Sequence, residues 1–201
     1  LVETDWVVGH VMEALDKAGV ADDTLLIFTA DNGTASAARF AALEAKGVNL
    51  RHHFSGWKSM IQEGGHRVPF VARWPGTVKP ASTCRGLICL NDFMATMADL
   101  HGATLPDDAA EDSTSFLPLL TGDADYLPHR PMVVHHEYKG NFAIRKGKWK
   151  LVPGKKPGLF DLESDPKESN NLADGHPEIV KRMAETLAQY QESGRSRDSR
   201  K

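Results

Sequence analysis

A carboxylate and a carboxamide stand side by side directly after an apolar segment. Residues 24–29 read TLLIFT, and Asp31, Asn32 and Gly33 follow one residue later. Such a run is typical of a strand buried on both faces, as in a parallel sheet. Ligand sites of open α/β sheets lie beyond the carboxyl ends of their strands. The two side chains offer hard oxygen donors, which suit Ca²⁺ or Mg²⁺, while a plain Asp-Asn-Gly turn is the alternative.

A second cluster of polar and glycine residues follows after a long connection. Residues 56–69 read GWKSMIQEGGHRVP, with a lysine near the start and a glycine-rich turn between a glutamate and an arginine. A lysine beside a divalent ion neutralises charge on the oxygens of an anionic substrate and on its leaving group. A solvated loop lysine is the alternative for Lys58.

These two clusters resemble the motifs of the type I, formylglycine-dependent sulfatases, which include the arylsulfatases. Residues 56–69 match the family pattern G-x-K-x-x-x-x-E-G-G-x-R-V-P, downstream of a strand that ends in Asp-Asn-Gly. Residues 143–151 and 160–172 resemble two later motifs in the family's order. The resemblance implies the α/β fold of the alkaline phosphatase superfamily. The chain would form the C-terminal part of that sandwich, with a mostly parallel sheet, plus a small subdomain of antiparallel strands and a helix.

The resemblance also implies a role for several individual side chains. Asp31 and Asn32 match ligands of the divalent ion, usually Ca²⁺ with Mg²⁺ as the alternative, and Lys58 matches the lysine that contacts the sulfate ester. Lys58 is therefore expected to approach Asp31 and Asn32 closely enough to share one anion with the bound ion. From their residue types alone, Glu63 and Arg67 are expected to form an ion pair that holds the turn around Gly64 and Gly65. His66 is expected to be a loop histidine near the pocket.

Two adjacent histidines and a basic segment in the second half of the chain could also contact a substrate. His135 and His136 lie in a predicted strand, where neighbours point to opposite faces, so both cannot bind one metal ion. A substrate contact by one of the two is the interpretation carried forward. The basic residues between Arg145 and Lys156 are expected to lie on the solvent face of a hairpin at a sheet edge.

The nucleophile of the family has no counterpart in this chain. A formylglycine arises from a cysteine or serine in a C/S-x-P-x-R setting, and neither Cys84 nor Cys89 has that setting. Both thiols are expected to be unpaired. The resemblance implies that the formylglycine belongs to a missing N-terminal part, so this chain alone should be inactive. The alternatives are a phosphodiesterase or phosphonate hydrolase of the same superfamily, or a non-catalytic fragment that only binds another chain.

The elements that would position these residues follow from hydrophobic periodicity and turn signals. An amphipathic helix is predicted from Thr4 to Ala18, and a second strand over residues 70–74. We divide the chain into residues 1–125, the C-terminal portion of the catalytic α/β domain, and residues 126–201, the small subdomain. Closely spaced strand candidates favour an antiparallel meander in the latter, and Pro177 suits the first turn of a final helix.

Composition limits the partners and the location of the protein. The net charge of −3 gives no electrostatic argument for nucleic acid, and no apolar run reaches the length of about 20 residues that a membrane helix needs. The expected partners are a sulfated small molecule or carbohydrate and the missing N-terminal part. Open strand edges could also cause self-association. A periplasmic or secreted location rests on the family resemblance alone.

Overall fold

The computed structural model describes residues 2–36, 40–49, 53–127 and 130–197. Its first part contains α1 (Val2–Ala18), β1 (Leu26–Thr29), α2 (Phe40–Glu44), α3 (Glu63–His66) and β2 (Phe70–Arg73). A middle segment contains η1 (Leu90–Asp92), α4 (Phe93–Leu100) and α5 (Leu117–Thr121). The last part contains β3 (Val133–His136), β4 (Phe142–Lys146), β5 (Trp149–Val152), β6 (Gly158–Asp161), η2 (Ala173–Gly175) and α6 (Pro177–Ser193). The mixed α/β class is confirmed.

The first two strands form a sheet of their own, and its pairing differs from the prediction. β1 and β2 are antiparallel, with Phe28 opposite Val71. Both segments are strands of one sheet, and the long connection brings the chain back along β1 in the reverse direction, so this pair adds no parallel ladder to the mostly parallel sheet that the resemblance implies. Phe28 of β1 is 36% exposed and the other residues of this strand are half-buried, so the expectation that the first strand is buried on both faces is wrong for the described chain.

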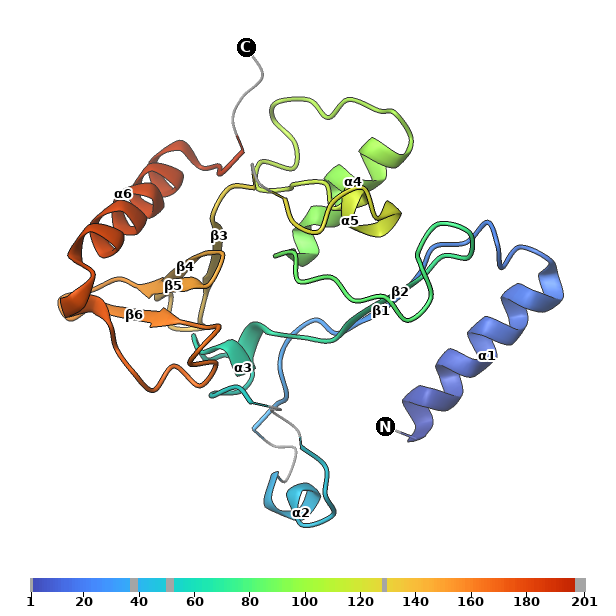
Figure 1. Cartoon of the computed structure of the whole chain (residues 1–201), viewed down its shortest axis with the longest axis horizontal. Helices are drawn as coiled ribbons and strands as arrows, with labels where there is room; N and C mark the ends of the chain where they lie inside the picture. Colours follow the sequence, from blue (N-terminus) through green and yellow to red (C-terminus); the bar gives the residue numbers. More distant parts are fainter. Residues whose placement is uncertain (1, 37–39, 50–52, 128–129, 198–201) are drawn as a thin grey trace.

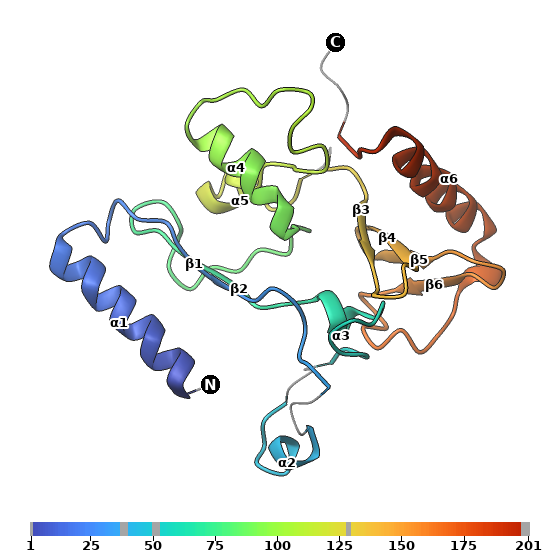
Figure 2. The same cartoon turned by 180° about the vertical axis from the view of Figure 1, so that it is seen from behind.

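Helix α1 confirms the predicted amphipathic segment, but it packs only loosely against the described part of the chain. None of its residues is buried, and Trp6, Val7 and Val11 are 60%, 47% and 42% exposed. Figures 1 and 2 show α1 standing apart from the two sheets, at the end of the β1–β2 ribbon. The large apolar side chains of Trp6, Val7 and Val11 in the helix, like those of Phe28 and Val71 in the ribbon, therefore remain exposed to solvent.

The second sheet is the predicted antiparallel meander, with the strand order β3-β4-β5-β6. One face packs against α6, where Ile144, Leu151 and Leu159 meet Met183 and Leu187 in the main hydrophobic core. Figure 1 shows α6 lying along this face of the sheet. The hairpin β4–β5 occupies the centre of the sheet, so its predicted position at an edge is wrong.

The middle segment is organised around a buried aspartate. Asp92 is fully buried and forms an ion pair of 2.7 Å with Arg130, while its carboxylate accepts hydrogen bonds from the amides of Cys89 and Thr114. Asp92 thus joins the segment before β3 to α4. No helix in the described part of the chain is long and apolar enough to cross a membrane. The proposed division at residue 125 stays a prediction.

Candidate active site

The loop after β1 is fixed by a close contact between two glycine-containing segments. The Gly33 amide donates a hydrogen bond of 3.0 Å to the carbonyl of Gly65. A Cβ atom placed on Gly33 would lie only 1.8 Å from the carbonyl oxygen of Gly64. Only glycine therefore allows the loop that carries Asp31 and Asn32 to reach the glycine-rich turn at α3.

The segment that carries Lys58 returns to the same loop. The Lys58 amide donates a hydrogen bond of 3.0 Å to the carbonyl of Thr34, and the Gly64 amide donates one of 2.7 Å to Ser55. A Cβ atom on Gly64 would meet the Ser55 carbonyl oxygen at 2.5 Å, so this packing also depends on glycine. Consequently the turn at α3 lies between the loop after β1 and the segment that carries Lys58.

One cavity of about 560 Å³ gathers the residues that the sequence singled out. Asp31, Asn32 and Lys58 line it together. The β3–β4 side contributes His135, His136 and Tyr138 to the lining, and the segment that leads into η1 contributes residues 85–89, together with Leu90 of η1. Both halves of the chain therefore build this cavity. The chemical roles of the individual residues stay predictions.

Glu63 of the glycine-rich turn is buried and makes more ion pairs than the sequence predicted. The expected pair with Arg67 is present at 3.5 Å, but Arg67 is 44% exposed. Closer partners come from the central hairpin of the second sheet: Arg145 at 2.9 Å and Lys150 at 3.2 Å. Burial alone would raise the pKa of Glu63, but the charges of Lys150 and Arg145 outweigh it and hold that pKa below its ordinary value.

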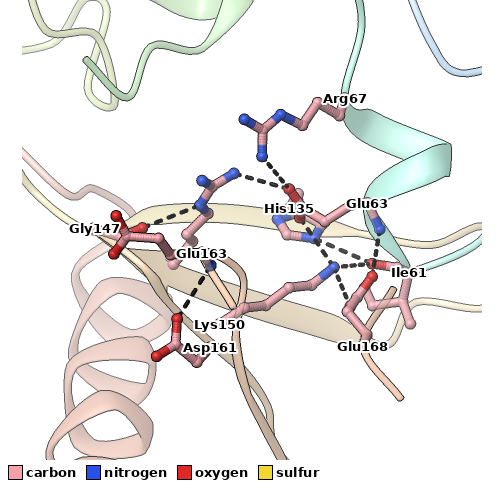
Figure 3. Close-up of polar contacts among 10 residues, drawn as sticks. Ile61, Glu63, Arg67, His135, Gly147, Lys150, Asp161, Glu163 and Glu168 are labelled. Atoms are coloured by element: carbon pink, nitrogen blue, oxygen red, sulfur yellow. Dashed lines mark hydrogen bonds and ion pairs between the residues drawn. The ribbon is translucent and has the colours of Figure 1, made fainter. Parts of the chain in front are cut away.

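Lys150 corrects the prediction that the basic hairpin faces solvent. Its side chain is 0% exposed and its ammonium group contacts Glu63, Glu168 and the carbonyl of Ile61, as Figure 3 shows. Arg145 is also largely covered. The face of the sheet that carries these cations is therefore covered by the glycine-rich turn, on the side opposite α6.

Two histidines line the cavity next to this group of charges. The rings of His66 and His135 lie 4.3 Å apart, centroid to centroid. Burial, reinforced by the positive charge of Lys150, lowers the pKa of His135 to about 3 and lowers that of His66. Nε2 of His135 also lies 3.3 Å from the Ile61 carbonyl. The His135 side chain is consequently neutral near pH 7 and forms part of the cavity wall. His136 also lines the cavity but is exposed to solvent.

The described residues supply part of a metal site. Across the described ranges, no group of three or more His, Cys, Asp or Glu side chains could hold an ion. Asp31 and Asn32 provide two hard donors on one cavity, which fits Ca²⁺ or Mg²⁺ chemically but falls short of the 6–8 oxygen ligands of Ca²⁺. Cys84 and Cys89 are both free thiols, as expected.

The mixed α/β fold thus brings a carboxylate, an amide and an amine together on one cavity. The Sulfatase family model matches residues 1–103. The chain is 34% identical to the N-acetylgalactosamine-6-O-sulfatase of Bacteroides thetaiotaomicron, over 93% of this chain and 40% of that protein. It is 32% identical to human arylsulfatase A, over 95% of this chain and 41% of that protein.

A solved structure gives the same result for the fold. A Bacteroides thetaiotaomicron protein, described in connection with the metabolism of multiple glycosaminoglycans, superposes with a TM-score of 0.85 at 33% identity. The match covers 94% of this chain and 43% of that chain. The present chain therefore belongs to the sulfatase family, and it spans about two fifths of the length of the relatives it matches.

Proposed function

We propose that this chain is the C-terminal part of a sulfuric ester hydrolase. The observation that carries the proposal is the cavity shared by Asp31, Asn32 and Lys58 in a member of the sulfatase family. Asp31 and Asn32 would hold Ca²⁺, with Mg²⁺ as the alternative ion. Such an ion, when bound, supplies positive charge that polarises the sulfate oxygens. Lys58 would donate a hydrogen bond to the ester and stabilise the charge that develops on the leaving oxygen.

The substrate would be a sulfated carbohydrate or a smaller sulfate ester that enters between the two sheets. His136 is the better placed of the two histidines to contact it, because it is exposed at the rim whereas Nε2 of His135 faces a backbone carbonyl. Tyr138 is 75% exposed on the same rim and offers an aromatic face. Sugar specificity would therefore depend on the β3–β4 side of the cavity.

The missing components of the site would come from an N-terminal part of the enzyme. It would supply the formylglycine nucleophile and the remaining metal ligands. Exposed apolar side chains of α1 and of the β1–β2 ribbon, among them Trp6, Val11 and Val71, support this. Figure 1 shows α1 apart from the β3–β6 sheet, beside the ribbon. Such a surface is suited to burial against further secondary structure. We propose a periplasmic or secreted location for the assembled enzyme, which cell fractionation would test.

The test is sulfate release from 4-nitrophenyl sulfate. The 201-residue chain should show no turnover alone. Turnover should appear when it is co-expressed with the N-terminal segment, taken from upstream of Leu1 in the gene or from a second gene. Lys58→Met should reduce kcat of the assembled enzyme by at least about a hundredfold. Lys155→Met, at another exposed lysine, is the control and should leave kcat unchanged.

Three results would contradict this assignment. Metal-dependent turnover by the isolated chain, lost on Asp31→Ala, would place the reacting groups within these 201 residues. Faster turnover of a phosphodiester or phosphonate ester than of the sulfate ester would move the enzyme to another activity of the superfamily. An assembled protein that hydrolyses none of these esters would leave a non-catalytic, binding role.

A further inference from the structure

Lys150 and Glu168 form a buried bridge behind the cavity. The Lys150 ammonium group donates to the Ile61 carbonyl at 2.7 Å, and lies 2.8 Å from Oε1 of Glu168 and 3.2 Å from Oε1 of Glu63. The side chains of Lys150, Glu168 and Glu63 are 0%, 3% and 3% exposed. Three charged side chains without access to water need fixed partners, and each of them obtains these from a distant segment (Figure 3).

Glu168 reaches this position through an unusual backbone conformation. Its φ angle is +56°, in the left-handed region that side chains other than glycine rarely occupy. The carboxylate uses both oxygens, because Oε2 accepts a hydrogen bond of 2.7 Å from the Glu63 amide while Oε1 contacts Lys150. The backbone turn that contains Glu168 is closed by a hydrogen bond of 3.1 Å from the Glu168 amide to the carbonyl of Asp165. A strained residue that is held by its surroundings in this way points to a function for its side chain.

The bridge is two contacts away from the residues assigned to the metal and the substrate. The turn that it binds continues through Gly64 and Gly65, and the Gly65 carbonyl accepts the hydrogen bond from Gly33, next to Asn32. A displacement of the glycine-rich turn would therefore shift Gly33 and, with it, the adjacent Asn32. It would also move the Lys58 segment, because Gly64 donates to Ser55 within the same connection.

We propose that Lys150 and Glu168 are positioning residues, which set the place of the glycine-rich turn and, through it, of Asn32 and Lys58. The effect of these two residues on catalysis rests on the function proposed above. Their effect on the position of the turn does not. Stability alone does not require this arrangement, because apolar side chains of similar volume often stabilise a fold as well as a buried ion pair. A directional bridge, in contrast, fixes where the turn lies on the sheet.

Amide hydrogen exchange in the 201-residue chain tests the structural part of the proposal. Lys150→Met and Glu168→Gln should each accelerate exchange of the Gly33, Lys58 and Gly64 amides by at least about tenfold. These amides make the hydrogen bonds that join the turn to the loop after β1 and to the segment that carries Lys58. Glu168→Gln keeps the side-chain volume, so it decides the question if Lys150→Met fails to fold.

The matched control is Lys148→Met on the same hairpin. Lys148 pairs with Asp161 at 2.7 Å, as closely as Lys150 pairs with its partners, but its side chain is 46% exposed. The control should leave exchange at Gly33 unchanged. Exchange in α6, at Met183 for example, reports the core and should change by less than about threefold in every variant. Equal acceleration at α6 and at Gly33 would show only lower global stability and would overturn the proposal.

Kinetics of the assembled enzyme test the catalytic part. Glu168→Gln should lower kcat on 4-nitrophenyl sulfate by about tenfold or more with a smaller change in KM, since the turn and not a substrate contact is displaced. Lys150→Arg, which keeps the charge, should recover part of the rate lost in Lys150→Met. Unchanged kcat together with faster exchange at Gly33 would refute positioning of the reaction. Absence of turnover in the unmodified enzyme would instead refute the proposed function. The hydrogen-exchange data would then still decide whether Lys150 and Glu168 position the turn.

Discussion

The contact between Gly33 and the glycine-rich turn predicts a large effect of one methyl group. In Gly33→Ala the new Cβ would lie 1.8 Å from the carbonyl oxygen of Gly64, which is a backbone atom and cannot rotate away. The two segments must separate by about 1.5 Å to restore an ordinary contact distance. That shift would break the 3.0 Å hydrogen bond from the Gly33 amide to Gly65.

The cost follows from these two effects. Overpacking costs about 1–3 kcal/mol, and the lost hydrogen bond adds about 1 kcal/mol. We therefore expect Gly33→Ala to lower the free energy of unfolding by about 2–4 kcal/mol and the Tm of the 201-residue chain by roughly 5–15 °C. In the assembled enzyme, the displaced Asn32 should reduce kcat by about a hundredfold, as expected for a shift near 1 Å.

A glycine without neighbours provides the comparison. Gly9 lies inside α1 and does not adopt a positive φ, and a Cβ atom placed on it would meet no other atom within 4 Å. Gly9→Ala should leave Tm unchanged or raise it slightly, because alanine favours the helix by up to about 1 kcal/mol. Thermal unfolding followed by circular dichroism measures both variants. Equal Tm values for Gly33→Ala and the unmodified chain would refute the argument from close packing.

Three further predictions concern pH, metal and association. Because burial holds the pKa of His135 at about 3, below its ordinary value of 6.5, the unfolded chain binds the proton more tightly and stability should fall as pH drops from about 6.5 towards 3. His135→Asn should flatten this slope in urea unfolding measured at several pH values, and an unaltered slope would contradict the assignment. By calorimetry, the chain alone should bind Ca²⁺ with at best about millimolar affinity, lost in Asp31→Asn, whereas tight binding would reveal further ligands. Sedimentation velocity should show concentration-dependent self-association that Trp6→Lys reduces and Glu13→Gln does not, and a monomer at every concentration would refute a role for the α1 face.

Local patterns in the sequence sufficed for α1, for the strands and for α6, whereas only the family resemblance placed Asp31, Asn32 and Lys58 together. Residues close together in the sequence specify each of these elements. The signals are the period of the apolar residues in α1, the short apolar runs of the second sheet and the proline at the start of α6. The pairing of β1 with β2 is not specified in this way, because about 40 residues separate the two strands and an apolar run fits either direction. The strand at residues 24–29 could therefore be predicted from its apolar run, whereas its antiparallel pairing with β2 could not.

The buried contacts of Lys150 with Glu63 and Glu168 could not be predicted from the sequence, because they join segments far apart in the chain. One sequence signal for them was nevertheless present. Alternation along β5 correctly separates Leu151, which faces α6, from Lys150 on the opposite face. What covers that opposite face depends on a turn nearly 90 residues earlier in the chain, which alternation cannot show. Yet Arg145 lies directly opposite Lys150 in the ladder, and like charges in such a pair destabilise a sheet. Two facing cations at the centre of a sheet therefore call for carboxylates from elsewhere, and the structure supplies them as Glu63 and Glu168.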